Sequence, residues 1–256
     1  MSGHSKWSQI KRQKGVADSR RGTAFTKAAN AITIAARSGG GNPDNNFKLR
    51  LAIEAARRLN MPKENIERAI ARGTGKGKEG VALEEVTYEG FGPAGVAIMI
   101  EAVTDNKQRT AQEVRSCFER GGGTLSGPSS VSHLFTPIGE LVVKIKEGID
   151  PDQLLLLAAD AGADDVETDQ NEAIVYCQAG DLDKVKNELA SKGLEPIESR
   201  LSRKPTSLVR IEDSAKAAAV LSLINKLDDL PDVQKVYANF DISEEVLERQ
   251  AEIAKF

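Results

Sequence analysis

The spacing of apolar residues changes at a glycine-rich segment, residues 73–78, and this change constrains the fold more than any other feature. Before the segment the apolar residues recur at the spacing of an amphipathic helix, and in the first expected helix they are Phe25, Ala29, Ile32 and Ala36. After it, short apolar runs at residues 86–91 and 96–104 predict strands. Because glycine at this density favours a flexible linker, we expect a small helical unit followed by a mixed α/β body.

Three helices are expected before the linker. The first covers residues 21–37 and ends at the glycines 39–41, which tolerate the left-handed conformation of a helix end. The second carries an apolar stripe made of Phe47, Leu51, Ala55 and Leu59. The third has Asn60 as its expected cap, Pro62 in its first turn, and a stripe of Ile66 and Ile70.

The body after the linker alternates strands and helices. Asn106 is expected to cap a helix that carries Val114 and Phe118, a glycine-rich loop follows at residues 121–128, and residues 131–135 predict a strand. Residues 140–201 follow the order strand, helix, strand, strand, helix, strand, which is ferredoxin-like. A helix at residues 214–227 and a strand at 233–240 would complete the sheet begun at residue 86, and the tail from Ser243 is at most a short helix.

These elements predict the fold class α/β (α+β) with three domains. The first is a basic helical domain at residues 1–78. The second is a discontinuous α/β domain made of residues 79–136 and 205–242, and the third is a ferredoxin-like domain, residues 137–204, inserted in the second.

Charge is divided unevenly along the chain. Residues 1–80 hold 17 Lys and Arg against 6 Asp and Glu, a net +11, whereas residues 81–256 hold 18 against 32, a net −14. A basic region of this kind is the usual electrostatic mark of nucleic-acid binding. The alternative is that the basic stretch docks on the acidic body of its own chain.

The candidate nucleic-acid-binding residues all belong to this basic region. The cations would meet phosphates without reading sequence. Trp7 can stack on an unpaired base, or it can instead pin the N-terminal arm onto the helical unit. The set is Lys6, Trp7, Lys11, Arg12, Lys14, Arg20, Arg21, Lys27, Arg37, Arg50, Arg57 and Arg58.

Signs of catalysis are missing from the sequence. The two histidines, His4 and His133, stand alone, and Cys117 and Cys177 form no metal-ligand spacing. The glycine-rich segment is no phosphate loop, because Arg72 stands where that motif needs its first glycine. We therefore expect no catalytic residue, no metal, no cofactor and no small-molecule substrate.

The cellular location is also expected from the sequence. It has no apolar run of membrane-spanning length and no secretory signal at its start. These features predict a cytoplasmic protein without a membrane partner.

Several long motifs resemble the YebC family, in that family's order and over nearly the whole chain. In the N-terminal region they are Gly3-His4-Ser5-Lys6-Trp7, Ile10-Lys11, Arg21-Gly22, Phe25-Thr26-Lys27 and Ala35-Ala36-Arg37-Ser38-Gly39-Gly40. Further along they are residues 60–70 (NMPKENIERAI), Tyr88-Glu89-Gly90-Phe91-Gly92-Pro93 and residues 104–110 (TDNKQRT). The sequence departs from the family pattern at Ala28-Ala29-Asn30-Ala31 and at Ser132-His133-Leu134.

The resemblance implies a three-domain α/β architecture and a role in gene expression without catalysis. Bacterial members are called probable transcriptional regulators that bind DNA, which makes a DNA-binding regulator the leading expectation. Mitochondrial relatives act as translational activators and some bacterial relatives are tied to the ribosome, so a factor that binds ribosomal RNA or the ribosome is the alternative. A scaffold that binds only proteins through its acidic domains is the third possibility.

Overall fold

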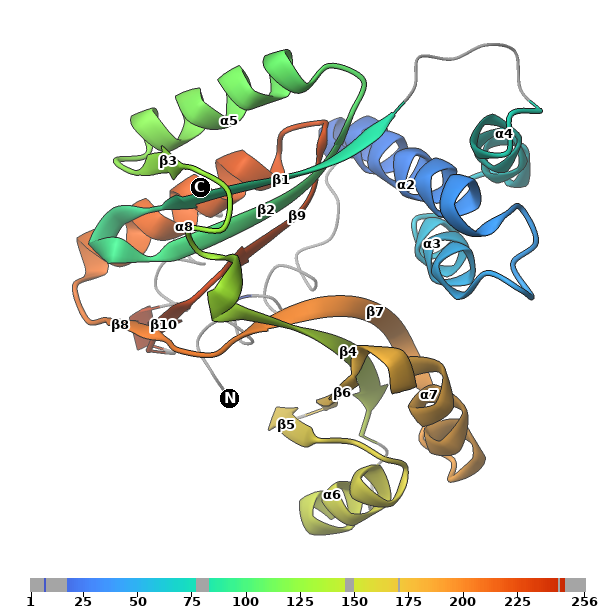
Figure 1. Ribbon diagram of the computed structural model, residues 1–256. Helices are drawn as coiled ribbons and strands as arrows, with labels where there is room; N and C mark the ends of the chain where they lie inside the picture. The colour runs from blue at the N-terminus through green and yellow to red at the C-terminus, as the bar shows by residue number, and fades with distance from the viewer. Residues whose placement is uncertain are drawn as a thin grey trace. The chain divides into compact units, whose positions relative to one another are not determined.

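The computed structural model describes residues 7, 18–76, 83–145, 150–169, 171–243 and 245–246 (Figure 1). Its contacts divide the chain into two compact units, of which one is Phe135–Lys204 and the other holds the chain on either side of it. N-terminal helices are followed by helices and strands in alternation, which confirms the α+β class. The three-domain division stays a prediction, and the tail beyond Val246 lies outside the described residues.

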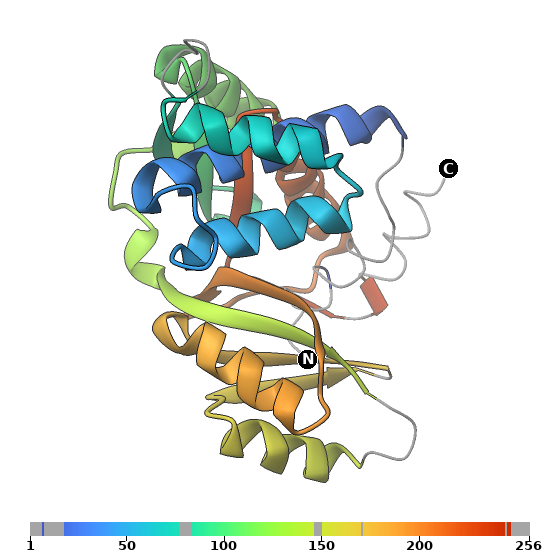
Figure 2. The same cartoon turned by 90° about the vertical axis from the view of Figure 1, so that its right-hand side faces the viewer.

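Three helices form the N-terminal part: α2 (Asp18–Gly39), α3 (Phe47–Arg58) and α4 (Lys63–Gly73) (Figure 2). Their shared core contains Ile32, Leu49 and Ala56, which are fully buried. The predicted stripe of α3 was right at Leu51 and, in part, at Leu59, which packs partly buried against the core. The buried face is made of Leu49, Leu51, Ile53 and Ala56. Phe47 instead lies at the half-buried start of the helix, where the Arg50 guanidinium stands 5.5 Å from its ring centroid.

Two asparagines set the turns between these helices. Asn46 is buried and caps α3 by accepting the Leu49 N–H at 3.1 Å, while its amide donates to the carbonyls of Ala35 at 2.7 Å and Gly40 at 2.8 Å. Asn60 was expected to cap α4, but its φ is +58° and it ends α3 instead. The N–H of Met61 reaches back to Ala56 and that of Asn60 to Arg57, which is the Schellman arrangement of a helix end.

Gly73 was expected to belong to a flexible linker, but it is the last residue of α4 and packs against α2. A Cβ atom there would stand 2.3 Å from the Thr33 carbonyl oxygen, so only glycine permits this approach of the two helices. The hydroxyl of Thr33 donates to the Ala69 carbonyl of α4 at 3.2 Å in the same contact. Residues 77 and 78 of the predicted linker lie outside the described residues.

The central α/β part is built on a four-stranded sheet of order β3-β1-β2-β9. Its strands are β1 (Glu84–Phe91), β2 (Ala97–Thr104), β3 (Thr124–Ser126) and β9 (Val233–Ala238), and the turn η1 (Pro93–Gly95) joins the first two. Helices α5 (Lys107–Arg120) and α8 (Ser214–Asp228) cover it, with Phe118 and Leu223 fully buried in the core (Figure 1). As predicted, the elements after residue 213 complete the sheet begun by β1, because β9 pairs with β2.

Three details of the central part differ from expectation. Residues 131–135 do not form a separate strand, because Ser132–Leu134 make the short turn η2 and the next strand begins only at Phe135. The expected glycine-rich loop contains the edge strand β3. The predicted strand 233–240 ends at Ala238, and β10 (Phe240–Ile242) pairs in parallel with β8 (Val209–Ile211).

The inserted unit has the strand order β5-β6-β4-β7, which confirms the ferredoxin-like prediction. Its strands are β4 (Phe135–Lys144), β5 (Asp165–Asp169), β6 (Glu172–Gln178) and β7 (Pro196–Pro205), and its helices are α6 (Pro151–Asp160) and α7 (Leu182–Ser191), with η3 (Ala179–Asp181) before α7. Leu141, Val143 and Val175 are fully buried in its core.

Candidate nucleic-acid interface

Part of the predicted binding set cannot be placed. Lys6, Lys11, Arg12 and Lys14 lie outside the described residues. Arg20 and Arg21 belong to the first turn of α2, but their side chains are outside the description as well. The contribution of the arm therefore stays a prediction.

Trp7 lies in the core of the central part. Its side chain is 8 % exposed and packs in the cluster that contains Val96, Ile98 and Phe240. The alternative prediction, that Trp7 pins the arm onto the helical unit, was wrong about the partner, because Trp7 packs in the core of the central part. A tryptophan this buried has little ring face left on which a base could stack.

Three further members of the predicted set have partners inside the protein. Lys27 donates from Nζ to the carbonyl of Asp228, at the C-terminal end of α8. Arg37 donates to the carbonyl of Leu83. Arg50 donates to the carbonyl of Pro43 at 2.9 Å. Each cation therefore holds an internal carbonyl group, whatever else it contacts.

The remaining predicted cations, Arg57 and Arg58, are exposed in the last turn of α3. Arg68 and Arg72 are exposed one turn apart on α4, although they were not in the predicted set. The sequence already places these two arginines one turn apart on the helix with the stripe Ile66 and Ile70, and this i, i+4 spacing is the signal that identifies them. A purely structural use is available too, since cations in a last turn offset the negative end of the helix dipole.

The helical unit has a strongly positive net charge. Residues 18–76 hold 12 Lys and Arg and 5 Asp and Glu, a net charge of +7. Besides the arginines, the unit exposes three lysines, Lys48, Lys63 and Lys76. The helical unit can thus offer several cations to one polyanion at once.

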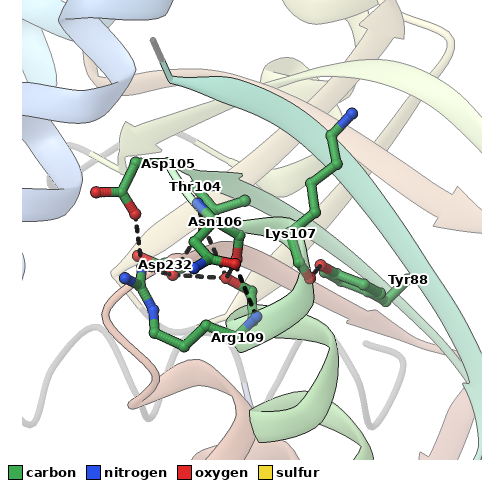
Figure 3. Close-up of polar contacts among 8 residues, drawn as sticks. Tyr88, Thr104, Asp105, Asn106, Lys107, Arg109 and Asp232 are labelled. Atoms are coloured by element: carbon green, nitrogen blue, oxygen red, sulfur yellow. Dashed lines mark hydrogen bonds and ion pairs between the residues drawn. The ribbon is translucent and has the colours of Figure 1, made fainter. Parts of the chain in front are cut away.

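A second polar cluster joins α5 to the segment before β9 (Figure 3). The Asp232 carboxylate accepts from the hydroxyls of Thr104 at 3.1 Å and Thr110 at 2.6 Å and from the Arg109 guanidinium at 2.6 Å. Burial works to raise the pKa of Asp232, but these donors outweigh it and hold the pKa below its usual value. The same guanidinium reaches Asp105 at 2.9 Å.

This cluster fixes the start of α5. Asn106 caps the helix by accepting the Arg109 N–H at 3.1 Å, and the Tyr88 hydroxyl donates to the Lys107 carbonyl at 3.3 Å. The expected cap at Asn106 is confirmed, but sequence reasoning missed Asp232, which is 122 residues from Thr110. Because the carboxylate is ionised and held by three donors, it is a structural anchor.

A second buried carboxylate, that of Glu89, holds a loop in a similar way. Glu89, only 6 % exposed, accepts the backbone N–H groups of Ser129, Val131 and Ser132 at 2.7–2.9 Å. Burial tends to raise the pKa of Glu89, yet these hydrogen bonds lower it overall. The carboxylate therefore shapes the loop that leads to η2.

Neither clustered metal ligands nor a membrane-spanning helix occurs among the described residues. Among them, no three His, Cys, Asp or Glu side chains gather as metal ligands would. None of the helices in the described ranges is both long enough and apolar enough to cross a bilayer.

Comparison with known proteins decides the family. The model of the TACO1/YebC N-terminal domain matches residues 5–76, and the model of the TACO1/YebC second and third domain matches residues 83–240. The chain belongs to the TACO1/YebC family. This confirms the resemblance found in its sequence motifs.

Relatives support the same assignment along the whole chain. A protein of Chloroflexus aurantiacus named "Probable transcriptional regulatory protein" is 51 % identical over 97 % of this chain and 99 % of its own. One of Herpetosiphon aurantiacus with the same name is 48 % identical over 98 % of this chain and 99 % of its own. The crystal structure of a conserved hypothetical protein from Aquifex aeolicus, 44 % identical, matches with a TM-score of 0.82 over 90 % of this chain and 94 % of that one.

Proposed function

We propose that this TACO1/YebC protein is a non-enzymatic, cytoplasmic, DNA-binding regulator of transcription that grips its target with the helical unit. The observation that carries the proposal is the exposed set of arginines on α3 and α4 within a unit of net charge +7. The names of its relatives, which call them probable transcriptional regulatory proteins, support the regulatory role.

The grip rests on phosphates. Arg57 and Arg58 on α3 and Arg68 and Arg72 on α4 are the residues that we assign to it, and the cations of the N-terminal arm add to them. Arginine suits this role because its planar guanidinium can donate two parallel hydrogen bonds to one phosphate. Phosphate contacts give affinity and orientation but no sequence preference.

A ribosomal or other folded RNA is the second candidate target. The exposed arginines are divided between two helices, whereas readout of duplex DNA commonly places one recognition helix in the major groove. Cations spread over two helices fit the phosphates of an irregular RNA surface equally well. On this alternative the protein is a translation factor.

One pair of variants tests the proposal. The first replaces Arg57, Arg58, Arg68 and Arg72 with Gln, which has a helix propensity close to that of Arg. The matched control removes the same charge from four exposed positions outside the helical unit, Arg115, Lys144, Lys184 and Lys216, again with Gln. Affinity for duplex DNA, hairpin RNA and purified ribosomes is measured for both.

We expect the first variant to lose at least about 30-fold in affinity for the physiological target and the control to lose little, because removing four phosphate contacts costs far more than a change in net charge. Tightest binding to DNA, with the loss seen there, supports transcription. Tightest binding to RNA or ribosomes, with the loss seen there, supports the translation factor. Equal binding by both variants would discard the helical interface and favour a protein scaffold.

A further inference from the structure

Helix α6 of the inserted unit exposes leucine where a surface helix ordinarily carries polar residues. Leu154 and Ala158 face the core and are fully buried, whereas Leu155 is 51 % exposed and Leu156 is 67 % exposed. Among the described residues five large hydrophobic side chains are exposed, and the two most exposed are this consecutive pair. Exposed leucines are common on protein surfaces, so the case for this pair rests on the charges around it.

The leucines lie within a defined pattern of charge. Residues three and four apart share a helix face, so Asp152, Leu156 and Asp160 form one outward row and Leu155 and Ala159 the next. All five residues are exposed, and the Asp160 side chain is 72 % exposed. The exposed Leu156 therefore has one carboxylate, Asp152, one helical turn before it and another, Asp160, one turn after it.

Asp160 is poorly placed for the stability of its own helix. A carboxylate in the last turn meets the negative end of the helix dipole, and α6 contains no Lys or Arg to offset it. Lys192 reaches Asp160 only at 3.4 Å, from outside the helix. The surrounding unit is acidic as well, with 8 Lys and Arg against 15 Asp and Glu in residues 135–204.

We propose that the outward face of α6 docks a short helical segment of a partner protein. That segment presents an apolar side chain with a Lys or Arg one turn before and one turn after it, which complements Leu156 between Asp152 and Asp160. The two carboxylates are eight residues apart, so the matching cations stand about 12 Å apart along the partner helix. A second copy of this chain seated through the same face is the poorer occupant, because α6 contains no Lys or Arg and would place carboxylates opposite carboxylates.

The test uses the full chain and a labelled 18-residue helical peptide with leucines on one face and lysines one turn before and after them. Its matched control peptide carries Glu at the lysine positions. Binding is followed by fluorescence anisotropy for the parent, for Leu155→Gln/Leu156→Gln, for Asp152→Asn/Asp160→Asn, and for Leu208→Gln. The last variant removes a leucine that is 45 % exposed outside the inserted unit.

We expect the lysine peptide to bind the parent, with a loss of at least tenfold on replacing either pair and no change for Leu208→Gln. The Asp variant should also lose most of the salt dependence, and the Glu peptide should not bind. Equal binding by the parent and the leucine variant would overturn the proposal. So would a dimer, seen in sedimentation, that the leucine variant dissolves. Nucleic-acid affinity measured on the same preparations separates this result from the fate of the proposed function.

Discussion

The helical unit and the inserted unit are of similar length but use their charged residues in opposite ways. Residues 18–76 have a net charge of +7 and display arginines at their surface, whereas residues 135–204 have a net charge of −7. In the inserted unit the cations hold the sheet together, since Arg200 pairs with the buried Glu140 and Lys204 lies 4.5 Å from the Tyr176 ring centroid. In the helical unit Lys27, Arg37 and Arg50 also serve the fold, so the contrast lies in the exposed arginines that we assign to a partner.

The contrast between the two units predicts its largest effect in the salt dependence of nucleic-acid binding. If the helical unit and its arm meet about six phosphates, log affinity should fall with log salt at a slope of about −5 on duplex DNA, or about 10³-fold between 50 and 200 mM. Fluorescence titrations at four salt concentrations measure the slope. An affinity that does not change with salt would remove the electrostatic grip.

The inserted unit provides the control for this slope. Its entry and exit are adjacent, because the Thr206 N–H donates to the Leu134 carbonyl at 2.8 Å. Replacing residues 135–204 with a short Gly-Ser loop should therefore leave the slope unchanged. A steeper or shallower slope would mean that the acidic unit takes part in binding.

Replacing one arginine in each unit sharpens the contrast. Arg200→Met removes the guanidinium that pairs with Glu140, a carboxylate only 5 % exposed, and should cost about 3 kcal/mol of stability without changing nucleic-acid affinity. Arg57→Gln should change stability by less than about 0.5 kcal/mol and lower the salt slope by about 1. Urea unfolding and salt titrations of both variants measure these effects. Adding Glu140→Gln to Arg200→Met should recover part of the stability, since the buried carboxylate is then replaced by a neutral amide.

The helical unit depends on an uncharged side chain for its own stability. Asn46→Ala removes the cap of α3 and both amide donors to the end of α2, and should cost about 2 kcal/mol. Asn45→Ala is the control, because that side chain is exposed. Thermal unfolding followed by circular dichroism compares the two. Equal melting temperatures would show that the turn does not depend on Asn46.

The smallest effect concerns pH and the inserted unit. Lys204 lies 2.6 Å from Asp165, and its hydrogen bond lowers the pKa of that carboxyl. A lowered pKa contributes stability above the unfolded value of 3.8 that is lost as the pH falls through the folded value. Because both side chains are well exposed, Lys204→Met should cost less than about 1 kcal/mol at pH 7. Urea unfolding at pH 7 and pH 2.5 should show the difference between parent and variant shrinking at the lower pH.

Sequence reasoning succeeded where neighbouring residues decide the structure. Periodicity located the three N-terminal helices, and the order of elements predicted the ferredoxin-like sheet. It failed where the deciding partner is distant: Glu89 orders residues about 40 positions away, and Lys27 meets a carbonyl 201 positions away. Gly73 was misassigned for the same reason, since its close neighbour Thr33 lies on another helix.

The candidate site likewise has residues that the sequence could predict and residues that it could not. Exposed Arg57 and Arg58 follow from helical spacing and charge, which a sequence displays directly. That Arg37 holds the Leu83 carbonyl depends on where the chain folds back, which charge patterns do not encode. Arg50 holds a carbonyl in the turn just before its own helix, and its charge alone does not show this either. The clusters around Asp232 and Glu89 were missed because a lone acidic residue in a sequence looks like solvated surface.

The burial of Trp7 gives the protein a built-in optical probe. It is the single tryptophan of 256 residues, and its indole is packed in the central core at 8 % exposure. Selective excitation near 295 nm therefore reports on one position, at the root of the basic arm. If the emission maximum stays blue-shifted when nucleic acid is added, Trp7 remains buried in the core while the protein binds. A red shift means that the tryptophan has left the core.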